Sequence, residues 1–254
     1  MHGQAVAPRA VKYDANAMNG VLLLFDVDGT LLLSGGAGMR AMMRVGVELF
    51  GENFQWDGVE TAGSLDPVIF AEVAARNGLE EIHAQHDRFR ESYLEALADE
   101  LEKGRSAIRV MPGVRQILDT LRHRAATARD VTLGLLTGNY GRAVTLKFAA
   151  VDLDPNWFSI AAFGDDAPTR PDLAALALRR FEEHAGRAAD PRRAIVIGDT
   201  PRDIACAHAN GCVAFAVATG PHRAEQLVEA GADHVVQDLS DPEPLLSLVD
   251  RLVA

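Results

Sequence analysis

The sequence predicts an α/β protein built on a doubly wound parallel sheet, with an α-helical second domain inserted into it. Two observations support this prediction. Short apolar runs rich in Leu, Val and Ile alternate with helical patterns along most of the chain, and strands that alternate with helices pair in parallel. A long stretch after the first run, residues 37–108, contains helical patterns alone, which indicates a separate helical unit.

The strands and helices of the sheet domain follow from these patterns in chain order. The predicted strands are 21–25, 131–136, 158–163, 194–198, 213–217 and 234–236. The predicted helices are 112–126, 140–150, 172–186, 201–210, 222–230 and 242–252. Each strand is a short apolar run, as expected where helices cover both faces of a parallel sheet.

The helical insertion is too long to be a structureless loop within a compact domain. We therefore expect residues 37–108 to form a helical cap, inserted between two core segments, 19–36 and 109–254. Gly35-Gly36 and Val110-Met111-Pro112-Gly113 are its expected hinges, because Gly and Pro interrupt the flanking patterns.

Composition limits the classes of function. The chain has 254 residues, 48% of them hydrophobic, and a net charge of −11, which argues against a nucleic-acid partner. No apolar run is long enough to span a bilayer, so we expect no membrane partner. Cys206 and Cys212 lack the spacing of a zinc site, and we expect reduced thiols in a cytoplasmic protein. Residues 1–18 lack an apolar segment and are expected to be a disordered arm.

The most informative segment is VLLLFDVDGTLLL, residues 21–33. Its apolar run ends at Asp26 and Asp28, where open α/β sheets bind ligands. One aspartate of such a pair can attack phosphorus, and the other can protonate the leaving oxygen and later activate water. A divalent cation, most suitably Mg²⁺, would hold carboxylate and phosphate together. An acidic Asp-Gly turn without chemistry is the alternative.

Three segments resemble, in order, motifs of the haloacid dehalogenase (HAD) superfamily. DVDGTL resembles the first, LLTGN at 135–139 the second, and IGDTPRD at 197–203 the fourth. The helical insertion after the first motif resembles the cap of the phosphoglycolate phosphatase-like group. The resemblance covers residues 21 to about 250 and implies a Rossmann-like core.

The resemblance assigns roles to the residues of these motifs. It implies that Asp26 is the nucleophile and that Asp28 is the general acid and then the general base. It also implies that Thr137 binds a phosphoryl oxygen. The alternative for Thr137 is that it caps the next helix. It implies a Mg²⁺ site made by Asp26, the Asp28 carbonyl and Asp199, with Asp203 as the orienting partner or as an acidic first-turn residue. The expected phosphate-binding residues are Gly29, Thr30, Gly138, Asn139 and Lys147.

The third motif departs from the superfamily pattern, which has a lysine that neutralises the nucleophile. Here FGDDAPTRPDLAAL places Arg170 before Pro171-Asp172, and we expect Arg170 to take this role. An arginine is bulkier than a lysine and is not interchangeable with it. Lys147, on the helix after the second motif, is the alternative; otherwise it is a surface lysine.

In the cap, TAGSLD at 61–66 resembles the Gly-x-x-Asp segment of phosphoglycolate phosphatase-like proteins. Ser64 and Leu65 replace the usual basic and hydroxyl residues, which weakens the case for glycolate. Arg40 and Arg44 either face the cleft or lie on a solvated helix face.

The expected function is a Mg²⁺-dependent phosphatase that acts on a small phosphomonoester, phosphoglycolate-like or a sugar phosphate, through an aspartyl-phosphate. A phosphomutase shares the same residues and is the alternative. A haloacid dehalogenase would attack carbon and have no use for Asp28. The change to Arg170 leaves open a non-catalytic phosphate-binding homologue. The expected partner is a small phosphorylated metabolite, and the protein is expected to be a monomer or a homodimer.

Overall fold

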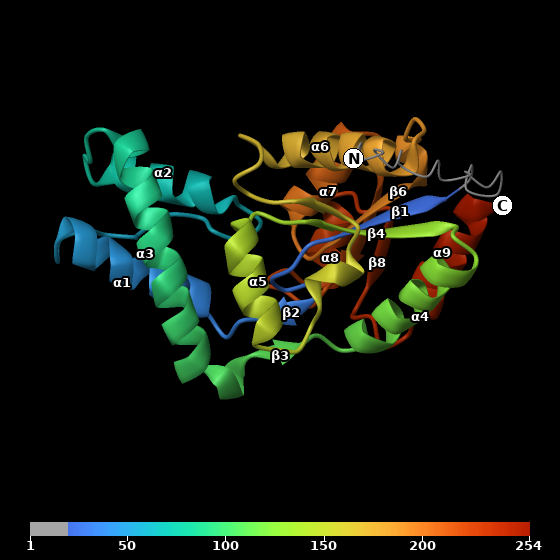
Figure 1. Ribbon diagram of the computed structural model, residues 1–254, viewed down its shortest axis with the longest axis horizontal. Coiled ribbons are helices and arrows are strands. Elements are labelled where there is room, and N and C mark those ends of the chain that lie inside the picture. The colour runs from blue at the N-terminus through green and yellow to red at the C-terminus, as the bar shows by residue number, and fades with distance from the viewer. Residues whose placement is uncertain (1–19) are drawn as a thin grey trace, which may run out of the picture.

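The computed structural model describes residues 20–254, so the predicted arm, residues 1–18, lies outside the described part. Its centre is a six-stranded parallel sheet with the order β5-β4-β1-β6-β7-β8 (Figure 1). The strands are β1 (Val21–Phe25), β4 (Val131–Leu136), β5 (Ile160–Ala162), β6 (Ala194–Gly198), β7 (Val213–Val217) and β8 (His234–Val236). The predicted fold class is confirmed, and only β5 is shorter than expected.

Strand β1 lies in the middle of the sheet because both of its faces are apolar. It pairs with β4 from Val21↔Val131 and with β6 from Leu22↔Ala194. Leu22 and Leu24 pack in a core with α6 (Arg170–Ala185), α7 (Pro201–Ala209) and α8 (Ala224–Glu229). The alternate residues of β1 pack on the other face with α4 (Val114–Thr127), α5 (Gly141–Ala149) and α9 (Glu243–Val253).

The insertion consists of three helices beside the sheet domain, on the left in Figure 1. They are α1 (Ala37–Phe50), α2 (Asp66–Arg76) and α3 (Ile82–Lys103). Their shared core is aromatic: Phe70 stacks on Phe89 with ring centroids 4.3 Å apart, and Phe89 stacks on Tyr93. The exposed Arg142 of α5 bonds Glu91 of α3 at 2.7 Å, which joins the insertion to the sheet domain.

A two-stranded antiparallel ladder, which the sequence pattern did not predict, lies at the base of the insertion. Strands β2 (Leu32–Leu33) and β3 (Arg109–Val110) pair through Leu32↔Val110, between segments far apart in the chain. Two residues are too few to show an alternating pattern. The ladder lies next to the two predicted hinges and fixes where the chain leaves and re-enters the sheet domain. The assignment of 37–108 as a separately moving cap stays a prediction.

Short turns complete the chain and explain small shifts in helix ends. The 3₁₀ turns are Arg105–Ala107, Pro155–Trp157 and Pro191–Arg193. Helix α6 begins at Arg170, two residues earlier than predicted, because the Thr169 side chain accepts the Asp172 backbone N–H as an N-cap. Within residues 20–254, none of the helices has the length and apolar character needed to cross a membrane.

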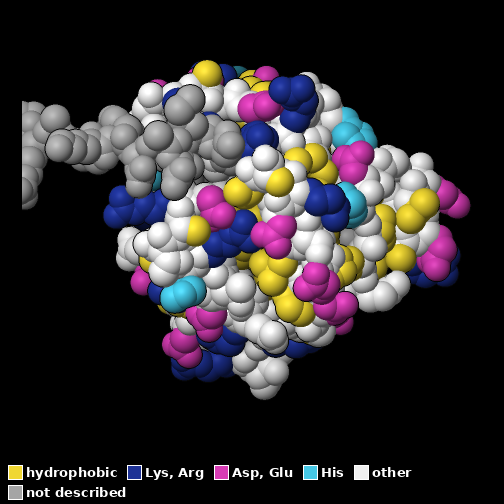
Figure 2. All heavy atoms as spheres, turned by 90° about the vertical axis from the view of Figure 1, so that its right-hand side faces the viewer, with side chains coloured by type: hydrophobic (Ala, Val, Ile, Leu, Met, Phe, Trp, Pro, Cys, Tyr) yellow, Lys and Arg dark blue, Asp and Glu magenta, His cyan; other side chains and the backbone are white. Residues whose placement is uncertain are grey.

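The outer face of the sheet domain carries mixed charge. On the coloured part of the face in Figure 2, acidic and basic side chains are interspersed with small apolar areas. A single-sign basic field of the kind that attracts nucleic acid is not present on this part of the face.

Candidate active site

Three polar residues follow neighbouring strands and meet at one edge of the sheet. Asp26 follows β1, Thr137 follows β4 and Asp199 follows β6, and all three are buried. They lie on one side of a cavity of about 380 Å³ whose other side is formed by the insertion. The carboxyl ends of parallel strands are the usual ligand site of such sheets, so the predicted residues are brought together where the topology requires.

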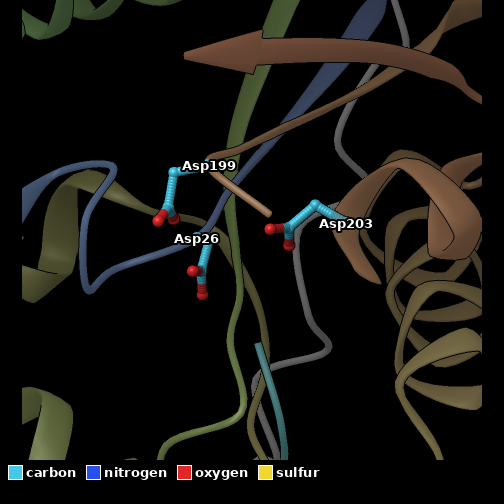
Figure 3. Close-up of side chains that lie close together, drawn as sticks. All are labelled: Asp26, Asp199 and Asp203. Atoms are coloured by element: carbon cyan, nitrogen blue, oxygen red, sulfur yellow. The ribbon is translucent and has the colours of Figure 1, made fainter. Parts of the chain in front are cut away.

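Three carboxylates form the most acidic part of the site. Oxygen atoms of Asp26, Asp199 and Asp203 lie within 4.8 Å of one another (Figure 3). Burial raises the pKa of Asp26 to about 6. Burial, together with repulsion from Asp26 and Asp203, raises the pKa of Asp199 to about 9. Placing these groups so close together is costly unless a cation compensates them.

Arg170 is the single cation in contact with this cluster among the described residues. Its Nη2 lies 3.1 Å from Asp26 Oδ1, and its Nε donates to Asp203 Oδ1 at 3.0 Å. Asp203 and Asp26 raise its pKa further, against its burial. When all three carboxylates are ionised, one guanidinium leaves two negative charges without a partner. An oxygen donor set with this surplus charge fits a divalent cation such as Mg²⁺.

Asp203 is held by the protein on both of its oxygens. Oδ1 accepts from Arg170, and Oδ2 accepts from the backbone N–H and hydroxyl of Thr200, at 3.0 and 2.6 Å, in the capping box of α7. Among the described residues, Asp199 has one hydrogen-bond partner, the hydroxyl of Thr30 at 3.1 Å. Asp199 is therefore freer than Asp203 to bind an ion, and Thr30 orients Asp199.

Gly29 supports this arrangement by its backbone. Its φ is +82°, and a Cβ at this position would come within 2.3 Å of Asp199 Oδ2. A side chain at position 29 would therefore displace the carboxylate and strain the turn. The hydroxyl of Thr219, in the loop after β7, donates to the Gly29 carbonyl at 2.5 Å.

Asp28 and Lys147 form a second ion pair in the cavity. Lys147 Nζ, on a side chain only 4% exposed, lies 2.5 Å from Asp28 Oδ2. Asn139 Nδ2 donates to the same oxygen at 2.8 Å, and the Ser34 hydroxyl to Oδ1 at 3.2 Å. Desolvation raises the pKa of Asp28, but Lys147 and these hydrogen bonds outweigh it and hold the pKa below its ordinary value. Lys147 is thus no surface lysine.

Thr137 faces the cavity and does not cap a helix. Helix α5 begins at Gly141 and has Tyr140 at its N-cap position, so the capping alternative for Thr137 is wrong. Its hydroxyl accepts from Asn139 Nδ2 at 2.8 Å and donates to none of the residues that the structure describes. Gly138 passes so close to the insertion that a Cβ would lie 1.9 Å from the Ser64 carbonyl oxygen.

The segment 61–66 of the insertion docks on the second motif. The Asp66 backbone N–H donates to the Gly138 carbonyl at 2.7 Å, and the Tyr140 N–H donates to Asp66 Oδ2 at 2.9 Å. Arg170 Nη1 also donates to the Gly63 carbonyl at 3.2 Å. These bonds hold the insertion over the strand ends and close the cavity on that side.

The arginines of α1 do not line the cavity. Arg40 Nε donates to Glu100 at 2.9 Å, and Arg44 Nη2 donates to Asp99 at 3.1 Å. They form an exposed ion-pair network between α1 and α3, which confirms the solvated-face alternative. Ser34 and Tyr93 also line the cavity, and the sequence pattern predicted neither of them as site residues. Ser34, after β2, carries no motif signal, and Tyr93 lies in an ordinary amphipathic pattern.

The comparisons with known proteins agree with this geometry. The sequence model of the haloacid dehalogenase-like hydrolases matches residues 23–208. The phosphoglycolate phosphatase of Escherichia coli K12 is 30% identical over 135 residues, 52% of this chain and 50% of that protein. The chain thus spans about half the length of the curated relatives it matches.

Solved structures share the fold. A hydrolase from Pseudomonas syringae superimposes with a TM-score of 0.65 at 21% identity, covering 92% of this chain and all (100%) of that one. CbbY from Rhodobacter sphaeroides, solved in complex with phosphate, superimposes with a TM-score of 0.66 at 22% identity, and the match covers 90% of this chain and 98% of that one. At these identities the likeness shows the fold alone.

Proposed function

Because this chain belongs to the haloacid dehalogenase-like hydrolase family, we propose that it is a Mg²⁺-dependent phosphatase that hydrolyses a small phosphomonoester through an aspartyl-phosphate. The observation that supports this most is the buried Asp26 in the cavity, with Arg170 beside it and a surplus of carboxylates around it. The half-length match to phosphoglycolate phosphatase points to the same reaction class.

The proposed metal site uses residues that fit the ion. Asp26, Asp199 and the backbone carbonyl of Asp28 would hold Mg²⁺, while Asp203 orients Arg170. When bound, the ion neutralises the carboxylates and the phosphoryl oxygens, so that they can approach each other.

In the proposed reaction Asp26 attacks phosphorus, and the bond to the leaving oxygen breaks. Asp28 first takes up a proton from solvent, against the effect of Lys147 on its pKa, and gives this proton to the leaving oxygen. As a carboxylate, Asp28 then takes a proton from the water that cleaves the aspartyl-phosphate. Thr137 and Arg170 donate to the phosphoryl oxygens, where negative charge is concentrated. Lys147, Asn139 and Ser34 hold the Asp28 carboxylate in one orientation.

The proposal includes the setting in which the protein works. Its partner is a small phosphorylated metabolite, without nucleic acid or membrane, and the protein acts in the cytoplasm as a monomer or homodimer. Two buried cysteines, Cys206 and Cys212, are unpaired, which fits a reducing compartment.

The activity is tested by phosphate release from a panel of small phosphomonoesters, with Mg²⁺ and with a chelator. We expect release that requires Mg²⁺ and returns when Mg²⁺ is restored. Transfer of the phosphoryl group between positions of a sugar phosphate, without release, would identify a phosphomutase instead. Equal release with and without the metal would contradict the proposed site.

Metal binding should also depend on pH, because Mg²⁺ competes with protons for Asp26 and Asp199. Burial raises both pKa values in the folded chain above the ordinary 3.8, to about 6 and about 9. In the metal-free protein their contribution to stability is greatest below about pH 4 and falls as the pH rises through these values. Added Mg²⁺ should therefore raise the Tm more at about pH 8 than at about pH 5.

Thermal unfolding with Mg²⁺ or chelator at the two pH values measures this effect. Asp199→Asn is the control and should show a much smaller gain in Tm at either pH. A gain in the unchanged protein that is the same at both pH values would show that these carboxylates are not the ligands.

A further inference from the structure

On the insertion side, apolar side chains line the cavity together with a few polar ones, and Tyr93 is one of these polar residues. Met39 and Met42 of α1 and Ile69 of α2 form its walls, and Tyr93 of α3 reaches it as well. These side chains come from the insertion and lie across the cavity from Asp26. Whatever group is esterified to the phosphate must fit among them.

Tyr93 presents its hydroxyl to the cavity. The residue is only 1% exposed, and its ring stacks on Phe89 at 6.3 Å and contacts Tyr140 at 5.8 Å. Within residues 20–254 its hydroxyl has no recorded hydrogen bond, although it lines the cavity. A phenylalanine would pack in the same place without offering a hydroxyl to the cavity. The hydroxyl is therefore suited to a ligand.

Gly38 keeps the space beside this hydroxyl open. It lies in α1 with an ordinary backbone conformation, so the chain does not require glycine there. A glycine within a helix is less favourable than an alanine. A Cβ at position 38 would lie 3.5 Å from the Tyr93 hydroxyl and 3.8 Å from Lys147 Nζ. An alanine would fit without a clash and would fill the space between these two groups.

The charges around the cavity argue against a second anion on the substrate. Its lining holds two cations among the described residues, Arg170 and Lys147, and four carboxylates. Arg170 is committed to Asp26 and Asp203. Lys147 is committed to Asp28, and it also lowers the pKa of Asp66, which burial raises to about 7. Both cations of the described lining therefore already face carboxylates of the protein, which disfavours a further carboxylate on the leaving group.

We infer that this site takes phosphomonoesters of small uncharged alcohols whose leaving group carries a further oxygen. This oxygen accepts a hydrogen bond from Tyr93. The site selects against a leaving group that carries a carboxylate. The inference rests on the proposed phosphatase function. It assigns Tyr93 and Gly38 to substrate selection and separates this chain from a specificity for glycolate.

Three esters of matched size test the inference: hydroxyethyl phosphate, phosphoglycolate and ethyl phosphate. We expect kcat/KM for hydroxyethyl phosphate to exceed that for phosphoglycolate by about tenfold or more. We expect Tyr93→Phe to lower the ratio of kcat/KM for hydroxyethyl phosphate to that for ethyl phosphate by about 3- to 10-fold, the value of one hydrogen bond. Gly38→Ala should lower the same ratio, mainly through KM.

Tyr140→Phe is the matched control. It removes the hydroxyl that bonds His86 at 2.9 Å in the same aromatic cluster, outside the cavity lining. Tyr140→Phe should leave the ratio of kcat/KM for hydroxyethyl phosphate to that for ethyl phosphate as in the unchanged protein. A general loosening of the aromatic cluster would instead lower kcat/KM for these two esters equally, in Tyr93→Phe and in Tyr140→Phe.

The outcomes separate the inference from the proposed function. A preference for phosphoglycolate, or a Tyr93→Phe effect equal on both uncharged esters, would overturn the inference and leave the phosphatase intact. Mg²⁺-dependent hydrolysis of p-nitrophenyl phosphate, without hydrolysis of any of the three esters, would also overturn the inference and leave the phosphatase function intact. Failure to hydrolyse any ester, p-nitrophenyl phosphate included, would overturn the proposed function itself.

Discussion

Asp26→Asn is expected to lower kcat on the order of 10⁴-fold or more, because the amide keeps the shape of the side chain and loses the nucleophile. The variant should still fold. It removes one of the two carboxylates that Arg170 contacts, and burial already disfavours the charge of Asp26. Steady-state phosphate release and thermal unfolding in chelator measure the two effects.

Asp119→Asn is the matched control for this variant, since it makes the same change on an exposed carboxylate of α4 that is 69% exposed. It should change neither kcat nor Tm appreciably. An Asp26→Asn protein that retains more than about a hundredth of the activity would show that Asp26 is not the nucleophile, since removal of a catalytic nucleophile costs far more.

Arg170→Met is expected to lower kcat by about 10²- to 10³-fold, the usual cost of losing a donor to a developing charge. It also leaves Asp26 and Asp203 without their counter-ion at a site where Arg170 is only 6% exposed. Breaking such a pair from one side costs about 3–5 kcal/mol of unfolding free energy. Kinetics on one substrate and denaturant unfolding in parallel measure both losses.

Arg170→Lys separates the two roles of this residue. A lysine keeps a positive charge but lacks the fork that reaches Asp26 and Asp203 together, so we expect activity between those of Arg170→Met and the unchanged protein. Lys147→Met provides the contrast, because Lys147 contacts Asp28 instead of Asp26. Activity of Arg170→Met equal to that of the unchanged protein would remove Arg170 from the proposed site.

The sheet was predictable because its strands carry their own signal. Runs such as VLLLF and AIVIG are buried throughout, and turn residues or polar groups bound them, so their edges lie where the pattern ends. The metal-binding and nucleophilic candidates were found for the same reason, since strand ends bring Asp26, Thr137 and Asp199 to one edge. Parallel topology converts a pattern along the chain into proximity in space.

The remainder depends on contacts between distant segments. The sequence left open whether Arg170 or Lys147 lies beside Asp26, because the answer depends on where α6 begins and on how α5 packs. In the structure Arg170 lies beside Asp26, and Lys147 lies beside Asp28. Tyr93 showed no signal because its helical pattern is that of any core residue. Its role in the cavity arises from the docking of the insertion through Asp66 and Gly138, which no local pattern encodes.

The central claim is that Asp26 carries the phosphoryl group during turnover. The direct measurement uses Asp28→Asn, in which the water that cleaves the intermediate has lost its base, and p-nitrophenyl phosphate, whose leaving group departs without a proton. After acid quenching and proteolysis, mass spectrometry should locate a phosphoryl group on the peptide that contains Asp26, in the presence of Mg²⁺ and not with chelator. Release of p-nitrophenol without any phosphorylated peptide, or with the phosphoryl group on another residue, would contradict the account.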